Sequence, residues 1–245
     1  MLNAVREWVG QAKHICVLTG AGISAESGVP TFREAQTGYW AQFKPEDMAS
    51  EAGFRSHPER VWQWYEHRRK LVAAVQPNAA HHALAQWGKK HPSKLDLITQ
   101  NVDGLHQRAG SDQVISLHGN LFSDKWLEPA HSCCSQALAM QQFTEGHPPC
   151  CPGCGNMRRP DVVWFGERLP ELALAQAEAA ANQCDLMLVI GTAGVVYPAA
   201  GLVFQAHERG ARIVIINTTS TELDVLASTV LIGPASETLP QLLSD

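Results

Sequence analysis

Six short apolar runs recur along the chain, and each ends at a glycine or a polar residue. They are rich in Val, Ile and Leu and do not alternate cleanly with polar residues, which is typical of parallel strands covered on both faces. We therefore expect buried strands at HICVLTG (14–20), LDLITQN (95–101), VISLHG (114–119), DLMLVIG (185–191), RIVIINT (212–218) and TVLIG (229–233).

Helical patterns lie between several of these runs. The first 14 residues predict an amphipathic helix, and further helices are expected at 79–90, 171–183 and 198–210, the last ending at a suitable C-cap glycine. The alternation of strand and helix predicts an α/β fold with a doubly wound, Rossmann-like parallel sheet.

Two stretches interrupt this alternation. Residues 35–77 have a helical pattern without a convincing strand, and residues 120–160 contain most of the cysteines and many prolines. We expect both to be insertions that form a smaller lobe, one helical and one cysteine-containing, within a single domain of 245 residues.

Composition narrows the classes of partner. The chain has 24 acidic and 19 basic residues, and no cluster of Lys and Arg suggests a nucleic-acid surface. The N-terminal segment lacks the features of a secretory signal, and no apolar run is long enough to cross a bilayer. We expect a cytoplasmic protein without nucleic-acid or membrane partners, in which the clustered cysteines indicate metal binding more than disulfides.

A glycine-rich segment, GAGISAESG (20–28), follows the first predicted strand. Gly20 and Gly22 would let the backbone approach a pyrophosphate, and the following N–H groups would bind its oxygens. An ordinary tight turn between strand and helix is the alternative. The third glycine, Gly28, comes too late for a GxGxxG motif, which argues against a standard dehydrogenase.

Polar residues also follow two other predicted strands, where open α/β sheets bind ligands. Gln100, Asn101 and Asp103 come after LDLIT, although an Asx turn entering the next helix would explain the same residues. His118 follows VISL and is the candidate general base, because an imidazole with an ordinary pKa near 6.5 accepts a proton near neutral pH. Most other histidines, among them His81, His82 and His106, are expected to be structural or to lie on the surface.

Tyr65 and Arg68 are three residues apart in WYEHRR (64–69), so they share one face of a predicted helix. Facing inward, a guanidinium and a phenol could hold a carboxylate. An amphipathic surface helix is the alternative.

Several motifs occur together in an order that resembles one family. After the glycine-rich loop come VPTFRE (29–34), TQNVDGLHQRAG (99–110), LHGN (117–120), RPDVVWFGE (159–167), GTAGVVYPAA (191–200), INT (216–218) and GPAS (233–236). In this set the chain resembles the sirtuins over nearly its whole length. The resemblance implies a single sirtuin-type catalytic domain that consumes NAD as a co-substrate.

The resemblance also implies roles for individual residues. Asn101 and His118 would be catalytic, and Phe32 would lie on a loop that guards nicotinamide. The implied cofactor-binding residues are Gly20, Ala21, Gly22, Ser24, Phe32, Arg33, Gln100, Asn101, Asp103, Gly191, Thr192, Ala193, Asn217 and Ala235. Ala193 replaces a serine of many relatives, so one hydrogen bond to the cofactor, worth about 1 kcal/mol, would be missing unless Thr192 compensates.

The implied reaction is lysine deacylation. The acyl-lysine carbonyl oxygen would attack C1′ of the nicotinamide ribose and expel nicotinamide, and His118 would help to deprotonate a ribose hydroxyl, giving free lysine and O-acyl-ADP-ribose. Val163, Trp164 and Phe165 would contact the acyl-lysine peptide. The Tyr65 and Arg68 pattern marks the branch that removes succinyl and malonyl as well as acetyl groups. A mono-ADP-ribosyltransferase and a non-catalytic NAD or ADP-ribose sensor are the alternatives.

The cysteines depart from the family pattern of two CxxC pairs. Cys151 and Cys154 form the second pair, but Trp126 and Pro129 stand where the first is expected. Cys133 and Cys134 are adjacent, a poor spacing for two ligands of one tetrahedral ion. One possibility is a shifted structural zinc site formed by Cys133, Cys134, Cys151 and Cys154, or with Cys150 or His131 in place of one of them. The alternative is a lobe without a metal.

Overall fold

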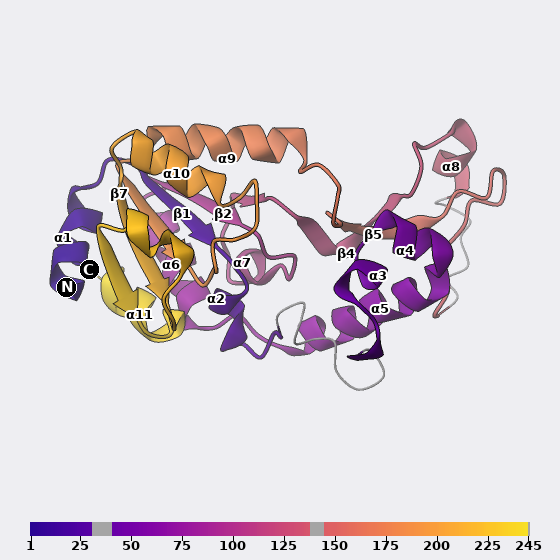
Figure 1. Cartoon of the computed structure of the whole chain (residues 1–245), viewed down its shortest axis with the longest axis horizontal. Coiled ribbons are helices and arrows are strands. Elements are labelled where there is room, and N and C mark those ends of the chain that lie inside the picture. Colours follow the sequence, from indigo (N-terminus) through magenta and orange to yellow (C-terminus); the bar gives the residue numbers. More distant parts are fainter. Residues whose placement is uncertain (31–40, 138–144, 245) are drawn as a thin grey trace. The chain divides into compact units, whose positions relative to one another are not determined.

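The computed structural model describes residues 1–30, 41–137 and 145–244, and it divides the chain into two compact units (Figure 1). The first unit comprises Met1–Thr31, Val75–His118 and Leu169–Asp245, and the second comprises Phe32–Ala74 and Gly119–Arg168. The sequence-based boundaries of the smaller lobe were 35–77 and 120–160. None of the described helices is both long and apolar enough to cross a membrane.

The first unit is built on a parallel sheet of six strands in the order β3-β2-β1-β6-β7-β8. All six predicted strands are present, which confirms the α/β, Rossmann-like fold. Their bounds are Ile15–Thr19 (β1), Leu95–Thr99 (β2), Val114–Ser116 (β3), Leu186–Ile190 (β6), Arg212–Asn217 (β7) and Thr229–Ile232 (β8). Because the strand order reverses between β1 and β6, the carboxyl ends of these two strands mark the switch point where such sheets bind ligands.

Helices cover both faces of this sheet (Figure 1). Alternate strand residues face opposite layers, as the pleat requires: Val17 packs with α1, α6 and α11, whereas Leu18 packs with α9 and α10. The helices of this unit are Leu2–Gln11 (α1), Gly22–Ala25 (α2), Ala79–Lys90 (α6), Leu105–Arg108 (α7), Glu171–Gln183 (α9), Gly201–Glu208 (α10) and Ala235–Leu242 (α11), with the 3-10 helix Glu222–Leu226 (η2). The predicted helices at 79–90 and 171–183 have the observed bounds, and α10 is shorter than its pattern suggested.

The second unit combines short helices with a two-stranded antiparallel sheet. Its elements are Pro45–Met48 (α3), Glu51–Ser56 (α4), Pro58–Ala74 (α5), Gly119–Trp126 (β4), Ser132–Ala137 (α8) and Arg158–Val162 (β5). The strand pair β4 and β5 was not predicted, because a charged strand with an irregular register lacks the alternation that identifies strands in a sequence. Buried aromatic residues of α4 and α5 form its core, including Phe54, Trp62, Trp64 and Tyr65.

Candidate functional site

The turns after β1 and β6 meet backbone to backbone at the switch point. Gly22 N donates to Gly191 O at 2.8 Å, and Gly20 N donates to Ile190 O at 2.9 Å. A Cβ atom on Gly20 would lie 2.7 Å from Cβ of Thr192, and one on Gly22 would lie 2.7 Å from Cα of Gly191. Close packing of the two turns is therefore a sufficient reason for glycine at these positions.

The N–H groups of the first turn already have partners within the protein. Ile23 N donates to Gly20 O at 3.2 Å and Ser24 N donates to Ala21 O at 3.0 Å, while Gly22 N donates to Gly191 O. A pyrophosphate that accepted hydrogen bonds from these N–H groups would have to replace the bonds that they make within the protein. Contact of this turn with phosphate stays a prediction.

Gln100 and Asn101 follow β2 and tie its end to both turns. Gln100 Nε2 donates to Thr192 Oγ1 at 3.1 Å, and Asn101 Nδ2 donates to Gly20 O at 3.1 Å. Asn101 Nδ2 also lies 3.2 Å from Ser24 Oγ. Of the two functions of this carboxamide, only the acceptor Oδ1 can serve a ribose hydroxyl without breaking these bonds.

Ser24, Asp103 and His81 form a buried chain of hydrogen bonds behind the first turn. The Ser24 hydroxyl donates to Asp103 Oδ2 at 2.8 Å and lies 3.4 Å from His81 Nε2. Because the single Ser24 proton is directed to Asp103, His81 Nε2 is the protonated nitrogen that faces Ser24, and Nδ1 accepts from Asn78 N at 3.3 Å. Burial lowers the pKa of His81 to about 4, with a smaller contribution from His82. This imidazole is neutral at neutral pH and fixes the hydroxyl that binds Asp103.

A second buried histidine continues this region. His106 Nε2 lies 2.9 Å from Thr19 Oγ1, which bonds Thr99 Oγ1 at 2.8 Å. The His106 ring packs edge-on against His81, with ring centroids 4.9 Å apart. Burial, with a smaller effect of His81, lowers the pKa of His106 to about 3. Both imidazoles are almost fully buried, and no sequence pattern indicated that they lie together.

His118 is oriented by the same strand end. Its Nδ1–H donates to the Gln100 carbonyl at 2.8 Å, which leaves Nε2 with the lone pair that a general base requires. Burial lowers the pKa of His118, and the bond to Gln100 opposes this shift without cancelling it. The neutral, proton-accepting form is therefore favoured at neutral pH.

An open pocket of about 580 Å³ lies at the carboxyl ends of β6 and β7. Asn217 Nδ2 donates to Thr192 O at 3.2 Å and so joins the two strand ends. The pocket is lined by Gly191, Thr192, Ala193, Val195, Asn217, Thr219, Ser220, Thr221 and Glu222. Four of these were expected from the sequence, but Val195 and the segment 219–222 were not, because hydroxyl residues after a strand also occur in ordinary loops.

Thr192 has hydrogen-bonding partners of its own. Its Oγ1 accepts from Gln100 Nε2 and from Gly194 N at 3.3 Å. These bonds leave its hydroxyl proton to replace the serine hydroxyl missing at Ala193.

The remaining predicted cofactor residues lie elsewhere. Ala21 precedes α2 as its N-cap, and Ala235 is the buried first residue of α11. Phe32 and Arg33 lie outside the described residues.

In the second unit, Tyr65 and Arg68 both lie on α5, as predicted. Tyr65 is 1% exposed and its hydroxyl accepts a hydrogen bond from Trp164 Nε1 at 2.9 Å. The guanidinium carbon of Arg68 lies 5.8 Å from the Tyr65 ring centroid and 5.9 Å from that of Trp64. Burial raises the pKa of Tyr65, although the positive charge of Arg68 opposes this, so the phenol keeps its proton at neutral pH.

The stretch Val163 to Phe165 follows β5 and is held by a buried ion pair. Arg159 is 2% exposed, forms an ion pair with Glu167, and places its guanidinium carbon 3.4 Å from the Trp164 ring centroid. Glu167 Oε2 also accepts from Trp164 N at 2.9 Å. Burial opposes ionisation of Glu167, but the bonds from Arg159 and Trp164 outweigh it and lower its pKa. No sequence pattern predicted the ion pair between Arg159 and Glu167 or the contact of Arg159 with the Trp164 ring.

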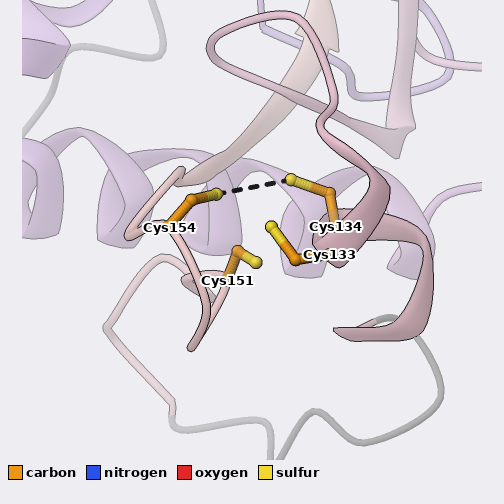
Figure 2. Close-up of side chains that lie close together, drawn as sticks. All are labelled: Cys133, Cys134, Cys151 and Cys154. Atoms are coloured by element: carbon orange, nitrogen blue, oxygen red, sulfur yellow. Dashed lines mark hydrogen bonds between the residues drawn. The ribbon is translucent and has the colours of Figure 1, made fainter.

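Four cysteines of the second unit converge (Figure 2). The sulfur atoms of Cys133, Cys134, Cys151 and Cys154 all lie within 4.8 Å of one another, and those of Cys134 and Cys154 are 3.6 Å apart. Four thiolates at such distances fit a tetrahedral zinc ion, whose Zn–S bonds are about 2.3 Å. The adjacent pair is therefore compatible with one site, contrary to the objection based on spacing. Cys150 is exposed, with its thiol 3.4 Å from Pro148 O, and is not part of this cluster.

Comparison with known proteins decides the family. The model of the "Sir2 family" matches residues 20–198. An "NAD-dependent protein deacylase" from Ralstonia nicotianae is 53% identical, over 98% of this chain and 94% of the relative. The chain belongs to the Sir2 family. The resemblance inferred from the sequence motifs is thereby confirmed.

Solved Sir2 structures share the whole fold of this Sir2-family chain. A "Sir2 homolog-NAD complex" superposes with a TM-score of 0.83 at 39% identity, covering 99% of this chain and 91% of the other. "Sir2Tm bound to a propionylated peptide" superposes with a TM-score of 0.82 at 30% identity, covering 99% and 97%. On this architecture, one of these two proteins binds NAD and the other binds a propionylated peptide.

Proposed function

We propose that this Sir2-family chain is an NAD-dependent protein-lysine deacylase that removes succinyl, malonyl and acetyl groups. The family membership and the similarity to proteins named NAD-dependent protein deacylases support the general activity. The observation that carries it is His118, an imidazole held in the proton-accepting tautomer by the Gln100 carbonyl, at the sheet edge that also presents Asn101 and Asp103.

In the proposed reaction, NAD is a substrate. The carbonyl oxygen of the acyl-lysine forms a bond to C1′ of the nicotinamide ribose as the C1′–N bond to nicotinamide breaks. A ribose hydroxyl, losing its proton with the help of His118, then adds to the acyl carbon, and water completes the release of lysine and O-acyl-ADP-ribose. Because burial lowers the pKa of His118, this base is neutral when the hydroxyl must be deprotonated.

Asn101 and Asp103 would orient the nicotinamide ribose and the nicotinamide amide. Their side chains are held before substrate binds, because Asn101 Nδ2 is tied to Gly20 O, and Asp103 accepts from Ser24 Oγ and from Leu105 N at 2.9 Å. Preorganised groups of this kind lose little entropy when the transition state forms. We therefore assign Ser24 a positioning role toward Asp103 as well as proximity to the cofactor.

Selectivity for acidic acyl groups would come from Tyr65 and Arg68. The Tyr65 oxygen accepts from Trp164, so its own proton remains for donation to a carboxylate. The guanidinium of Arg68, within 6 Å of the Tyr65 ring, supplies the charge that a succinyl or malonyl carboxylate needs and an acetyl group does not.

The acylated peptide would pair with the backbone of the Val163 to Phe165 stretch. Two N–H groups there are already used, since Trp164 N donates to Glu167 and Phe165 N donates to Ala49 O at 2.8 Å. Donation to the peptide would therefore come from the N–H of Val163, while carbonyl groups of the stretch would accept from it. Trp164 is buried and Phe165 is 58% exposed, which suits Phe165 for direct contact with the peptide.

The test is a paired assay of product formation. Pure protein is incubated with NAD and with succinyl-lysine or acetyl-lysine peptides of identical sequence, while nicotinamide and deacylated peptide are both quantified. We expect the two products in equal amounts, faster turnover of the succinyl peptide, and no turnover by His118→Ala. Nicotinamide release without deacylation would favour ADP-ribosyl transfer to protein, and NAD binding without any nicotinamide release would favour a sensor.

A further inference from the structure

A line of buried hydrogen bonds runs from α7 to the backbone of Asn101. The hydroxyl of Thr19 on β1 donates to Thr99 Oγ1 on β2 at 2.8 Å, and His106 Nε2 lies 2.9 Å from Thr19 Oγ1. Thr99 Oγ1 also accepts from the backbone N–H of Asn101 at 3.0 Å. His106, Thr19 and Thr99 are each at most 2% exposed, so water has no access to the bonds between them.

The direction of each bond in this line follows from the protons that are present. The single hydroxyl proton of Thr19 is directed to Thr99, so His106 Nε2 carries a proton and donates to Thr19. Burial, with a smaller effect of His81, lowers the pKa of His106 to about 3, so the ring is neutral and Nδ1 has no proton. This nitrogen has no hydrogen-bond partner within the part of the chain that the structure describes.

The unpaired Nδ1 means that stability alone does not account for a histidine at position 106. A buried polar atom without a partner is unfavourable for folding, and a leucine there would avoid that cost. The imidazole supplies instead the Nε2–H bond to Thr19, which no apolar side chain can make. This bond restricts the rotation of the Thr19 hydroxyl, which has a second and longer contact with Ile98 O at 3.4 Å.

Asn101 is held at two points, and the line from His106 accounts for one of them. Its side-chain Nδ2 is tied to Gly20 O and Ser24 Oγ, which sets the rotation of the carboxamide. Its backbone N–H is tied to Thr99, which sets the position of the backbone that carries this side chain. Both bonds are needed to place Asn101 Oδ1, because displacements of less than 1 Å are costly in a catalytic site.

We propose that His106 is a positioning residue for the deacylation reaction and acts on Asn101 through the hydroxyls of Thr19 and Thr99. The inference rests on the proposed function, in which Asn101 orients the nicotinamide ribose. In this role His106 exchanges no proton with a substrate. Its loss displaces Asn101 and weakens an interaction that matters most in the transition state, so kcat falls while KM changes little.

The experiment measures kcat and KM for deacylation of an acyl-lysine peptide at saturating NAD, and thermal unfolding confirms that each variant is folded. His106→Leu removes the donor, whereas His106→Gln keeps an N–H near the position of Nε2. Thr99→Val removes the hydroxyl with little change in volume, whereas Thr99→Ser keeps it. Ser228→Ala is the control, because it removes a hydroxyl that accepts from Ile213 N at the amino ends of β7 and β8.

We expect His106→Leu and Thr99→Val each to lower kcat by about tenfold to a hundredfold, with KM changed by less than about threefold. His106→Gln, Thr99→Ser and Ser228→Ala should all stay within about threefold of the wild-type kcat. The double variant of His106→Leu and Thr99→Val should be no slower than the slower single variant, because both changes interrupt the same line. The pH dependence of kcat should keep its shape, since His118 remains the base.

Three results would overturn the positioning role while leaving the deacylase function in place. They are a wild-type kcat in both His106→Leu and Thr99→Val, losses that multiply in the double variant, and a changed shape of the pH dependence in His106→Leu. If His106→Leu does not fold, Thr19→Val compared with Thr19→Ser decides the matter by the same criteria. A wild-type protein that deacylates no peptide would instead contradict the proposed function, and the positioning role with it.

Discussion

The indole Nε1 of Trp164 donates a hydrogen bond to the hydroxyl of Tyr65 across 99 positions of sequence, at 2.9 Å. Both side chains are almost fully buried. The bond joins two parts of the proposed substrate site, since Tyr65 belongs to the acyl-binding pair on α5 and Trp164 to the peptide-binding stretch after β5. It also fixes the Tyr65 oxygen as an acceptor toward Trp164, so its proton points elsewhere.

Arg68→Met should change acyl selectivity more than overall activity. Without the guanidinium, a succinyl carboxylate loses a charge-assisted hydrogen bond of about 1.5–3 kcal/mol, so we expect kcat/KM for succinyl-lysine to fall by about tenfold to a hundredfold. The acetyl-lysine value should change by less than about threefold, since an acetyl group carries no carboxylate. Steady-state kinetics on peptides of identical sequence provides the measurement.

Lys70→Met is the matched control for Arg68→Met, because it removes a positive charge from the exposed side of the same helix. Its succinyl-to-acetyl ratio should stay close to that of the wild type. Equal losses on both peptides in Arg68→Met would show that Arg68 supports the structure or catalysis in general, and the assignment of acyl selectivity would then be wrong.

Tyr65→Phe should lower the free energy of unfolding by about 1–3 kcal/mol, because it leaves the buried Trp164 N–H without its acceptor. Urea denaturation of the single variants Tyr65→Phe and Trp164→Phe and of the double variant gives the coupling energy of the pair. We expect the double variant to be less destabilised than the sum of the two single changes. Strict additivity would mean that the bond contributes nothing measurable to stability.

The buried histidines predict a loss of stability in mild acid. The pKa values of His81 and His106 are about 4 and about 3 in the folded protein, below the ordinary 6.5 of an unfolded chain. The unfolded state therefore binds more protons below pH 6.5, and the stabilisation present above that pH is lost as pH falls toward 4. By pH 5 each histidine should cost about 2 kcal/mol.

Urea unfolding as a function of pH measures this effect. His81→Gln should reduce the slope of stability against pH between about 6.5 and 5, where the unfolded histidine titrates. A slope that is the same in His81→Gln as in the wild type would show that His81 is not held neutral by the fold.

The cysteine cluster predicts one zinc per chain. Cys154→Ser should lower both the zinc content and the melting temperature, because a four-sulfur site loses a ligand and metal binding contributes directly to folding. Cys150→Ser should keep both unchanged, since Cys150 lies outside the cluster. Metal analysis and thermal unfolding, with and without a chelator, decide between these outcomes; full zinc occupancy in Cys154→Ser would exclude Cys154 as a ligand.

The strands, the principal helices and the position of His118 were predictable because they depend on local patterns. A run of branched apolar residues predicts a buried parallel strand, and the residue after such a strand must lie at the carboxyl edge of the sheet. The cluster of Cys133, Cys134, Cys151 and Cys154 was harder to predict from the sequence. A short helix and a turn bring these cysteines together, whereas their spacing along the chain suggested a poor metal site.

Polar contacts between residues far apart in the chain could not be predicted from the sequence. The pairing of Arg159 with Glu167, the chain from His81 through Ser24 to Asp103, and the link from Tyr65 to Trp164 depend on which buried polar groups meet after the core has formed. Each such group needs a partner once buried, but nothing local in the sequence specifies which one.

The backbone contact of Gly20 and Gly22 with Gly191 has a consequence for recombination among relatives. The two turns are about 170 positions apart in the chain but pack in direct contact. A larger residue in the first turn would therefore clash with the backbone of the second. A foreign first turn that keeps both glycines should therefore fit against the resident second turn. One that carries a side chain at either position should fit only if the second turn changes with it.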